Sequence, residues 1–365
     1  MLKEISIKNF RCFENSTFKG FGRVNLIGGK NNAGKTALLE ALFLNFYPSD
    51  STIRLIQNFR GEDDKASRLY PDLTWENLFY NQQKEQKILI HSIGFDETFS
   101  DVTLSCDENI DDFIRYTEDK DKEDEDLLKM KNNLVDAVKS ALHLEASKNG
   151  SPYASNVMIA SSQGQIGSKQ GMSDSTVVSF IHSKYNYSAH SLAGDFDFAY
   201  EKGFYDRIIK ALQTIDKSIS EARTSSVGGS VIKLKREKEK SMSLSYYGDA
   251  MNKVMSIILK SLKGKENSAL LIDEIENGIH YTAHKEFWKM LFELTNEFKI
   301  QVFATSHSFE MIKAFNEVAT EATFKDMATY FEMARHAKTN KIIVNPMDMD
   351  ILNYEIKSHS SFRGE

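Results

Sequence analysis

Two stretches far apart in the chain carry the residue types that phosphate chemistry needs. Residues 29–36 fit the pattern G-x-x-x-x-G-K-[ST] in full, which is the P-loop or Walker A motif. In such a loop successive backbone N–H groups face a phosphate, and the lysine bridges the β- and γ-phosphates. We therefore expect Lys35 to bind phosphates and the Thr36 hydroxyl to bind Mg²⁺. The other residues expected to cradle the nucleotide are Gly29, Asn31, Asn32, Ala33 and Gly34.

The second stretch places two adjacent carboxylates, Asp273 and Glu274, after the apolar run 269–272. This order predicts that Asp273 is the Walker B residue, which holds Mg²⁺ directly or through water. Glu274 is positioned to polarise the attacking water as a general base. A P-loop alone does not separate kinases, GTPases and ATPases, but the two stretches together predict an ATP-hydrolysing site.

A histidine follows the next apolar run. His307 comes just past the segment 300–305, whose residues suit a buried strand. Neighbouring parallel strands end on the same edge of a sheet, where ligands bind in such folds. We therefore expect His307 to reach the γ-phosphate as a second catalytic residue.

These side chains require strands that end together and a helix that begins at the P-loop. The run 23–27 is typical of a strand, and leucines from 38 to 44 keep helical spacing after it. The runs 269–272 and 300–305 favour central parallel strands, and 287–298 favours a helix between them. This alternation around a glycine-rich loop predicts an α/β core with a parallel sheet.

The middle of the chain gives weaker patterns. Leucine and valine spacing across 127–142 predicts an amphipathic helix, and 148–175, rich in Ser, Gly and Gln, predicts an exposed loop. Apolar residues from 208 to 219 and from 251 to 258 predict two further helices. No sustained heptad array is present, which argues against the long coiled coil of a ring-forming protein.

Composition restricts the class of protein. The chain has 365 residues, a formal charge of −6, 41% hydrophobic and 27% charged residues, as in ordinary globular proteins. Cys12 and Cys106 lack metal-ligand spacing and are expected to be reduced thiols. No apolar run approaches the roughly 18–20 residues of a membrane span, and the alternating N-terminus has no signal-peptide core. We expect a cytoplasmic protein that does not contact the membrane.

The motifs as a set resemble a known family. The segments 7–13, 270–280 and 305–307, with the early P-loop, look like the ABC-type ATPase heads of the RecF, SMC and OLD-like branch. Proteins of this branch are often labelled AAA-family ATP-binding proteins in bacterial genomes. The resemblance implies a mixed, mainly parallel sheet with an N-terminal antiparallel part and a helical or mixed insertion. It also implies that 276–280 is the D-loop, and that the C-terminus leaves no room for an appended Toprim nuclease.

The same resemblance implies a signature motif that reaches the nucleotide of a second protomer. The best match is 243–251, in which Tyr246, Gly248 and Asp249 would act in trans. It departs from the family pattern, because Tyr246 stands where a serine is expected and Ala250 replaces a glycine. Arg11 resembles an arginine that approaches the nucleotide in SMC-like heads. A Q-loop is not identifiable, and Gln82 and Gln83 are its only candidates.

These expectations define a division of the chain and a function. The ATPase core is expected over 1–50 and 230–365, with 51–229 as an insertion. The resemblance implies an ATPase, slow and regulated by a partner or DNA, that uses ATP and Mg²⁺. It would act as a homodimer switch controlling a separate effector, a nuclease or toxin, in bacterial anti-phage defence.

The alternative is a RecF-like DNA-repair ATPase that binds DNA directly. Basic residues at 54–68 and 233–240 would then face phosphates, although a solvated charged surface is the simpler explanation. A transporter ATPase is less consistent, because the chain lacks a clean Leu-Ser-Gly-Gly-Gln motif. A small-molecule kinase would not explain the Asp-Glu pair followed by a histidine.

Overall fold

A central, mainly parallel sheet brings the chemistry-bearing segments together. The structure is a computed structural model that describes residues 1–62, 64–107, 138–162, 164–170, 177–185, 187–226 and 229–358. The sheet has six strands in the order β16-β15-β3-β14-β13-β9, and only the β15–β16 pair is antiparallel. Its strands are β3 (Val24–Gly29), β9 (Val178–Ile181), β13 (Ala269–Ile272), β14 (Gln301–Thr305), β15 (Ala328–Arg335) and β16 (Ile342–Met347).

Every residue of β13 and of β14 is buried, because layers cover both faces of this sheet. Strands covered on both faces tend to be continuous apolar runs, as 269–272 is, and 300–305 departs from this only at Gln301 and Thr305. The predicted α/β class with a mainly parallel sheet is confirmed.

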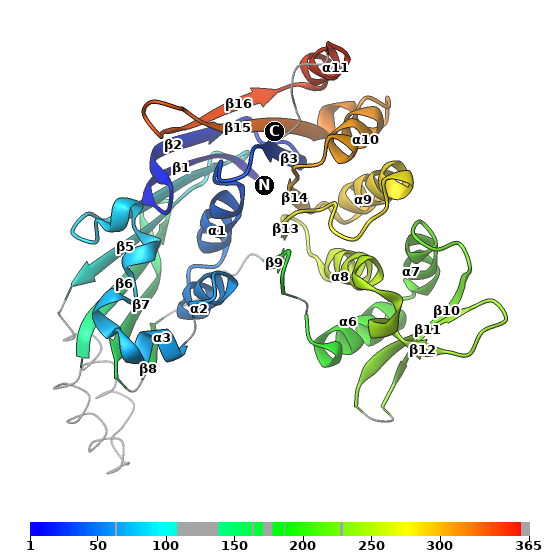
Figure 1. Ribbon diagram of the computed structural model, residues 1–365, viewed down its shortest axis with the longest axis horizontal. Helices are drawn as coiled ribbons and strands as arrows, with labels where there is room; N and C mark the ends of the chain where they lie inside the picture. Colours follow the sequence, from blue (N-terminus) through cyan, green and yellow to red (C-terminus); the bar gives the residue numbers. More distant parts are fainter. Residues whose placement is uncertain are drawn as a thin grey trace.

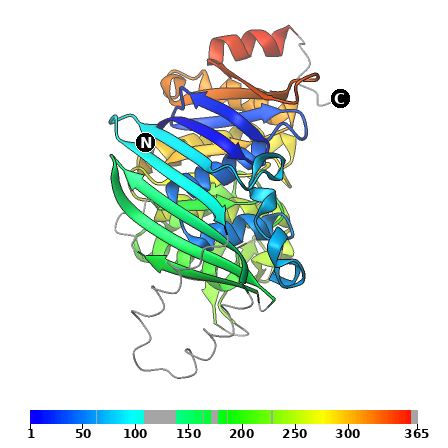
Figure 2. The same cartoon turned by 90° about the vertical axis from the view of Figure 1, so that its left-hand side faces the viewer.

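A second, antiparallel sheet has seven strands in the order β2-β1-β4-β5-β6-β7-β8 and is seen face-on in Figure 2. Its strands are β1 (Leu2–Phe10), β2 (Phe13–Lys19), β4 (Ile88–Gly94), β5 (Phe99–Asp107), β6 (Val138–Lys148), β7 (Ser151–Ser161) and β8 (Gly164–Gln170). Alternate residues of β1 and β4 are buried, so this sheet turns one face to the core and one to solvent.

Helix α1 (Lys35–Phe46) lies between the two sheets (Figure 1). All residues from Ala37 to Asn45 are buried, because apolar layers surround the helix on every side. α1 therefore starts at the P-loop and runs through the core, which fixes the position of that loop.

The other face of the parallel sheet is covered by α8 (Asp249–Lys263), α9 (His284–Phe298) and α10 (Phe309–Ala319). A smaller three-stranded sheet, β10 (Ile219–Ser225), β11 (Val231–Arg236) and β12 (Met242–Ser243), packs near α6 (Ala189–Glu201) and α7 (Tyr205–Leu212). The remaining elements are α2 (Asp50–Phe59), α3 (Asp64–Leu69), α11 (Met349–Lys357), η1 (Pro71–Leu73), η2 (Glu76–Leu78), η3 (Tyr80–Gln82), η4 (Leu244–Tyr247), η5 (Tyr281–Ala283) and η6 (Lys325–Met327).

Two expectations for the middle of the chain are wrong, and a third holds only in part, because the helix expected over 208–219 ends with α7 at Leu212 and Ile219 begins β10. Val138 and Leu142, assigned to a helix, lie in strand β6, while 127–137 lies outside the described residues. A spacing of four residues fits one face of a helix, but being even it also fits one face of a strand. The segment 148–175, expected to be a loop, contains β7 and β8. Its small polar residues occupy an antiparallel sheet that requires less apolar surface than a central one.

Segment 51–229 contributes to both large sheets. Strand β4 pairs with β1, and β9 pairs with β13. The expected boundaries, a core over 1–50 and 230–365 and an insertion over 51–229, therefore do not coincide with the boundaries of the sheets. The division into domains stays a prediction. Cys12 and Cys106 are both free thiols. No helix in the described ranges is long and apolar enough to cross a membrane.

Candidate active site

A cavity of about 1200 Å³ opens where β3, β9, β13 and β14 end, at the N-terminus of α1. The P-loop, the Asp-Glu pair and the histidine, which the sequence predicts to act together, all contribute to its lining. The residues that line the cavity include Arg11, Asn31, Asn32, Ala33, Gly34, Lys35, Thr36, Arg60, Gln82, His182, Ser183, Asp273, Glu274, Thr305, His307 and Arg335.

Lys35 folds back over its own loop. α1 begins at Lys35, and the Lys35 ammonium donates to the carbonyl oxygens of Gly29 at 2.6 Å and Lys30 at 3.0 Å. Burial lowers the pKa of Lys35, and the carboxylates of Glu276 and Glu332 oppose that shift. A polyphosphate would offer the ammonium stronger acceptors than these carbonyl groups.

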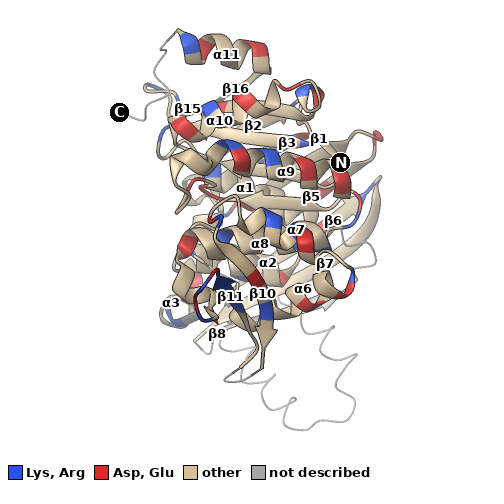
Figure 3. Ribbon diagram, turned by 90° about the vertical axis from the view of Figure 1, so that its right-hand side faces the viewer, with Lys and Arg blue, Asp and Glu red and all other residues tan. Residues whose placement is uncertain are grey.

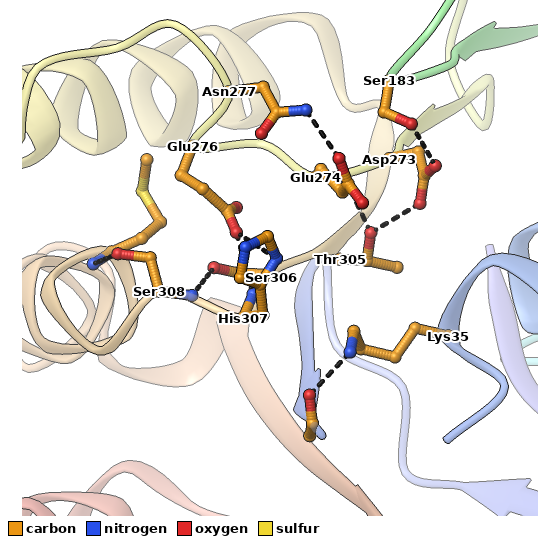
Figure 4. A network of polar contacts seen from close by, with 12 residues as sticks. Lys35, Ser183, Asp273, Glu274, Glu276, Asn277, Thr305, Ser306, His307 and Ser308 are labelled. Carbon is orange, nitrogen blue, oxygen red and sulfur yellow. Dashed lines mark hydrogen bonds and ion pairs between the residues drawn. The ribbon is translucent and has the colours of Figure 1, made fainter. Parts of the chain in front are cut away.

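Three hydroxyl groups converge on the carboxylate of Asp273, which is only 2% exposed. Thr36 Oγ1 donates to Oδ1 at 3.0 Å. Thr305 Oγ1 also donates to Oδ1, at 2.9 Å, and Ser183 Oγ donates to Oδ2 at 2.9 Å (Figure 4). Among the described residues, no lysine or arginine forms an ion pair with Asp273. A buried carboxylate held only by hydroxyl groups lacks a counter-charge in direct contact, although Lys35, Arg60 and Lys253 are close enough to interact with Asp273 electrostatically.

His182 does not supply that counter-charge. Its Nε2 lies 3.9 Å from Asp273 Oδ2, and its ring stacks on Phe59 with centroids 4.3 Å apart. The Lys184 N–H donates to His182 Nδ1, which places the proton of a neutral ring on Nε2. Burial lowers the pKa of His182, which favours this neutral ring.

Glu274 has a left-handed backbone with φ +47°. This conformation costs a residue with a side chain about 1–2 kcal/mol, so contacts must hold it. Its N–H donates to Thr305 Oγ1 at 2.8 Å, and Asn277 Nδ2 donates to Glu274 Oε2 at 2.6 Å. Asn277 thereby fixes the position of the Glu274 carboxylate.

Glu276 orients His307. Oε1 of Glu276 accepts from the backbone N–H of His307 and lies 2.9 Å from its Nδ1 (Figure 4). With the Nδ1 proton directed at this carboxylate, Nε2 is the ring nitrogen left for a ligand. The His307 side chain is 48% exposed at the cavity, whereas that of Glu276 is 10% exposed.

Arg11 lines the cavity, but its guanidinium is engaged by protein groups. Arg11 Nε donates to Glu40 Oε2 at 3.0 Å, and Nη1 donates to the carbonyl oxygen of Asn77 at 2.7 Å. Arg60 Nε donates to the other oxygen of Glu40 at 2.7 Å, so the fully buried Glu40 braces both arginines. The expected approach of Arg11 to a nucleotide stays a prediction. The Arg60 side chain, at 41% exposed, is the more accessible cation.

The signature-like segment does not line the cavity of its own chain. Tyr246 is 79% exposed in η4, and Asp249 opens α8. Gly248 between them has φ 85° and ψ 173°, a backbone region that essentially only glycine occupies. Of the two Q-loop candidates, Gln82 lines the cavity and Gln83 does not, and Gln82 bonds Asn77 rather than Asp273.

Several site residues have no motif by which the sequence could identify them. Ser183 and His182 follow a strand of only four residues, β9, in a stretch without a recognisable pattern. Glu276 falls within the D-loop resemblance, yet its contact with His307 depends on tertiary structure. Arg335, which donates to the carbonyl oxygen of Asn32 at 3.3 Å, lies about 300 residues from the loop that it supports.

Comparison with known proteins agrees with this geometry. Residues 24–312 match the family described as "AAA domain, putative AbiEii toxin, Type IV TA system". The chain is 26% identical over 352 residues to the "ATP/GTP phosphatase" of Helicobacter pylori, covering 91% of this chain and 92% of that protein. It is 47% identical over 47 residues to the "DNA double-strand break repair Rad50 ATPase" of Archaeoglobus fulgidus, covering 13% and 5% of the two chains. A solved SMC head domain from Thermotoga maritima aligns over 95% of this chain and 99% of its own, with 12% identity and a TM-score of 0.42.

The fold and the cavity define a P-loop ATPase of the ABC-type head class. Because the family match spans most of its length, the chain belongs to the AAA-domain family that includes AbiEii-like proteins. The expected class of protein and the expected ATPase activity are confirmed at this level.

Proposed function

We propose that the protein is an ATP-driven switch that works as a head-to-head homodimer. The observation that carries this proposal is that residues 246–249 lie outside the cavity that Lys35, Asp273 and Glu274 line. In a two-fold symmetric pair, each chain would present the N-terminus of its α8 to the cavity of the other. The free N–H groups and positive end of that helix suit a γ-phosphate.

Within each site, the side-chain oxygen atoms of Thr36, Asp273 and Ser183 would bind Mg²⁺. Mg²⁺ prefers oxygen ligands, and a cation there is supported by the buried Asp273 carboxylate, which among the described residues has hydroxyl partners but no direct ion pair with a lysine or arginine. When bound, the ion would neutralise charge that develops on the phosphates. The Thr36 and Ser183 hydroxyl groups, which donate hydrogen bonds to Asp273 here, would then bind the ion through their oxygen lone pairs.

Hydrolysis of ATP to ADP and phosphate would then use three further side chains. Lys35 would leave its loop carbonyls for the β- and γ-phosphates, and Glu274 would take the proton of the attacking water. His307 would offer Nε2 to the γ-phosphate, held in place by Glu276. The same reaction would release or reorient the pair of heads.

We assign the output of this switch to a separate effector, a nuclease or a toxin, in bacterial anti-phage defence. The family description, which names AbiEii toxin and a type IV TA system, supports this assignment, and the likeness to an ATP/GTP phosphatase supports the nucleotide chemistry. Copurification of the full chain with a second protein, whose activity then depends on ATP hydrolysis, would support the assignment.

Mixing two inactive variants tests the composite site. Lys35→Ala damages the nucleotide side of the site, and Gly248→Ala damages the side offered in trans, because alanine is strained at φ 85°. Each variant alone should hydrolyse ATP slowly. An equimolar mixture should recover about a quarter of the wild-type rate, since half of the dimers are mixed and carry one intact site.

The matched control mixes Lys35→Ala with Glu274→Gln. Both substitutions affect the nucleotide side, so no mixed dimer contains an intact site and activity should stay low. A Lys35→Ala and Gly248→Ala mixture that is no more active than its separate components would contradict the composite site.

Direct DNA binding is the alternative. Lys233 and Lys235 lie on β11, where Figure 3 shows basic segments beside acidic ones. Lys235 lies 4.0 Å from Glu221, and Arg236 pairs with Asp216 at 2.7 Å. This mixture of signs is typical of a solvated surface. Binding of duplex DNA by the isolated chain, weakening steeply as salt rises, would favour the repair function instead.

A further inference from the structure

A buried lysine joins helix α8 to the turn that carries Glu274. Lys253 lies one turn into α8 and is 7% exposed. Its ammonium donates to the backbone carbonyl oxygen of Asp273 at 3.2 Å and to that of Glu274. Both acceptors belong to the turn that follows β13, so this side chain spans from the helical layer to the end of the central strand.

Burying the Lys253 ammonium costs solvation free energy. Burial lowers the pKa of Lys253 to about 8, because the charged form is poorly solvated there. An apolar side chain of similar length would fill the same space without losing that solvation. What the ammonium adds is a pair of hydrogen bonds to two consecutive carbonyl groups.

These bonds act on a strained residue. Glu274 has φ +47°, and its N–H is already held by Thr305 Oγ1 at 2.8 Å. Lys253 holds the carbonyl oxygen of the same residue and that of the residue before it. The peptide groups on both sides of Glu274 are therefore fixed, which is the condition under which a left-handed residue with a side chain persists.

The same turn also touches the start of α8 directly. A methyl group on Gly278 would lie 2.9 Å from the backbone nitrogen of Ala250, so the two backbones pack without a side chain between them. Ala250 is in the first turn of α8, next to Gly248 and Asp249. The segment proposed to act in trans and the turn of Glu274 thus form one packed unit.

We propose that Lys253 is a positioning residue for hydrolysis, which holds the Glu274 backbone in its left-handed conformation and passes displacements of the start of α8 to the Glu274 carboxylate. This inference rests on the proposed role of Glu274 as the general base. Lys253 touches neither nucleotide nor water, and acts through the direction it gives to another side chain.

The substitution Lys253→Met removes the two hydrogen bonds and keeps the length of the side chain. The kcat for ATP hydrolysis should fall about 10- to 100-fold, because a small displacement of a reacting group has an effect of that size. The Kd for a non-hydrolysable ATP analogue should change less than about threefold, since the P-loop is untouched. A structural defect alone would lower kcat and also raise this Kd.

Lys260→Met is the matched control on the same helix. Lys260 is also mostly buried, with a side chain 10% exposed, but it pairs with Asp195, which Lys263 also contacts. Its loss should leave kcat within about threefold of the wild-type value. Equal loss of kcat in the Lys253→Met and Lys260→Met variants would overturn the proposal.

Combining Lys253→Met with Glu274→Gln separates this inference from the proposed function. If Lys253 acts through Glu274, it should lower kcat much less in the Glu274→Gln background than in the wild type. The same factor in both backgrounds would overturn the inference, and a normal rate for Glu274→Gln alone would overturn the proposed general base. Should Lys253→Met not fold, Lys253→Gln, whose shorter side chain cannot reach both carbonyl oxygens, carries the same comparison.

Discussion

The two regions that the proposed dimer would bring together are built in opposite ways. The nucleotide region, around Lys35, Asp273 and Glu274, lies in the core, and Asp273 is 2% exposed with three hydroxyl partners. The signature region, 243–251, contains an aromatic side chain, Tyr246, that is 79% exposed. The first region is ordered by its own chain, whereas the second has polar and aromatic groups that its own chain leaves at the surface.

The backbones of the two regions also differ in how they are held. Both regions contain a residue with positive φ, Glu274 at 47° and Gly248 at 85°. The first is held by a hydrogen bond that its N–H donates to Thr305 and by one that its carbonyl oxygen accepts from Lys253, while among the described residues no non-neighbouring atom lies within 4 Å of a Cβ built on the second. Strain at Glu274 is held by surrounding contacts, and strain at Gly248 is avoided by glycine. In the proposed dimer, the nucleotide region would be the preorganised half of the site, and the signature region would be the open half.

The largest effect should come from the ordered region. Glu274→Gln removes the proposed general base, so kcat should fall about 10²- to 10⁴-fold while ATP still binds. Because the γ-phosphate is no longer released, ATP-bound dimers should accumulate. Phosphate-release kinetics and sedimentation velocity with and without ATP measure the two outcomes. A Glu274→Gln protein that hydrolyses ATP at the wild-type rate would show that Glu274 is not the general base.

A smaller effect is expected at the metal ligands. Ser183→Ala removes a donor from Asp273 and a proposed ligand of Mg²⁺, so half-maximal hydrolysis should need about tenfold more Mg²⁺. Titration of the ATPase rate with Mg²⁺ measures this shift. Ser306→Ala is the control, because that hydroxyl accepts from Ser308 rather than bonding Asp273. An unchanged Mg²⁺ requirement for Ser183→Ala would exclude Ser183 from the metal site.

The smallest effect is expected in the open region. Tyr246→Ala should leave ATP binding by the monomer and the thermal unfolding midpoint unchanged, because the side chain is exposed. ATP-dependent dimerisation should weaken about fivefold or more, as for an aromatic residue at an interface. Tyr354→Ala, at a 70% exposed tyrosine on α11, should not change dimerisation. Equal behaviour of the two variants would show that Tyr246 is ordinary surface.

The sequence predicts the ordered region well, because its strands and loop leave local signals. The P-loop and the runs 269–272 and 300–305 are each short local segments, and each indicates its own conformation through glycine spacing or mainly apolar character. Their meeting around one cavity then follows from the rule that parallel strands end on one edge.

Other features could not be predicted because they depend on partners distant in the chain. Ser183 contacts Asp273, 90 residues away, and nothing in its neighbours marks that contact. Arg60, first assigned to a basic surface, instead bonds Glu40 inside the molecule. Strand β6 was mistaken for a helix because Val138 and Leu142 satisfy both periodicities.

The position of β3 in the centre of the parallel sheet has a consequence for synthesis on the ribosome. Its neighbours are β14 and β15, so a strand completed by residue 29 must wait for residues 301–305 and 328–335. The Thr36–Asp273 contact likewise spans 237 positions. Long-range pairings of this kind form late. A nascent chain therefore carries its P-loop for most of translation without a completed nucleotide site, and the ATPase becomes active only once nearly the whole chain has emerged.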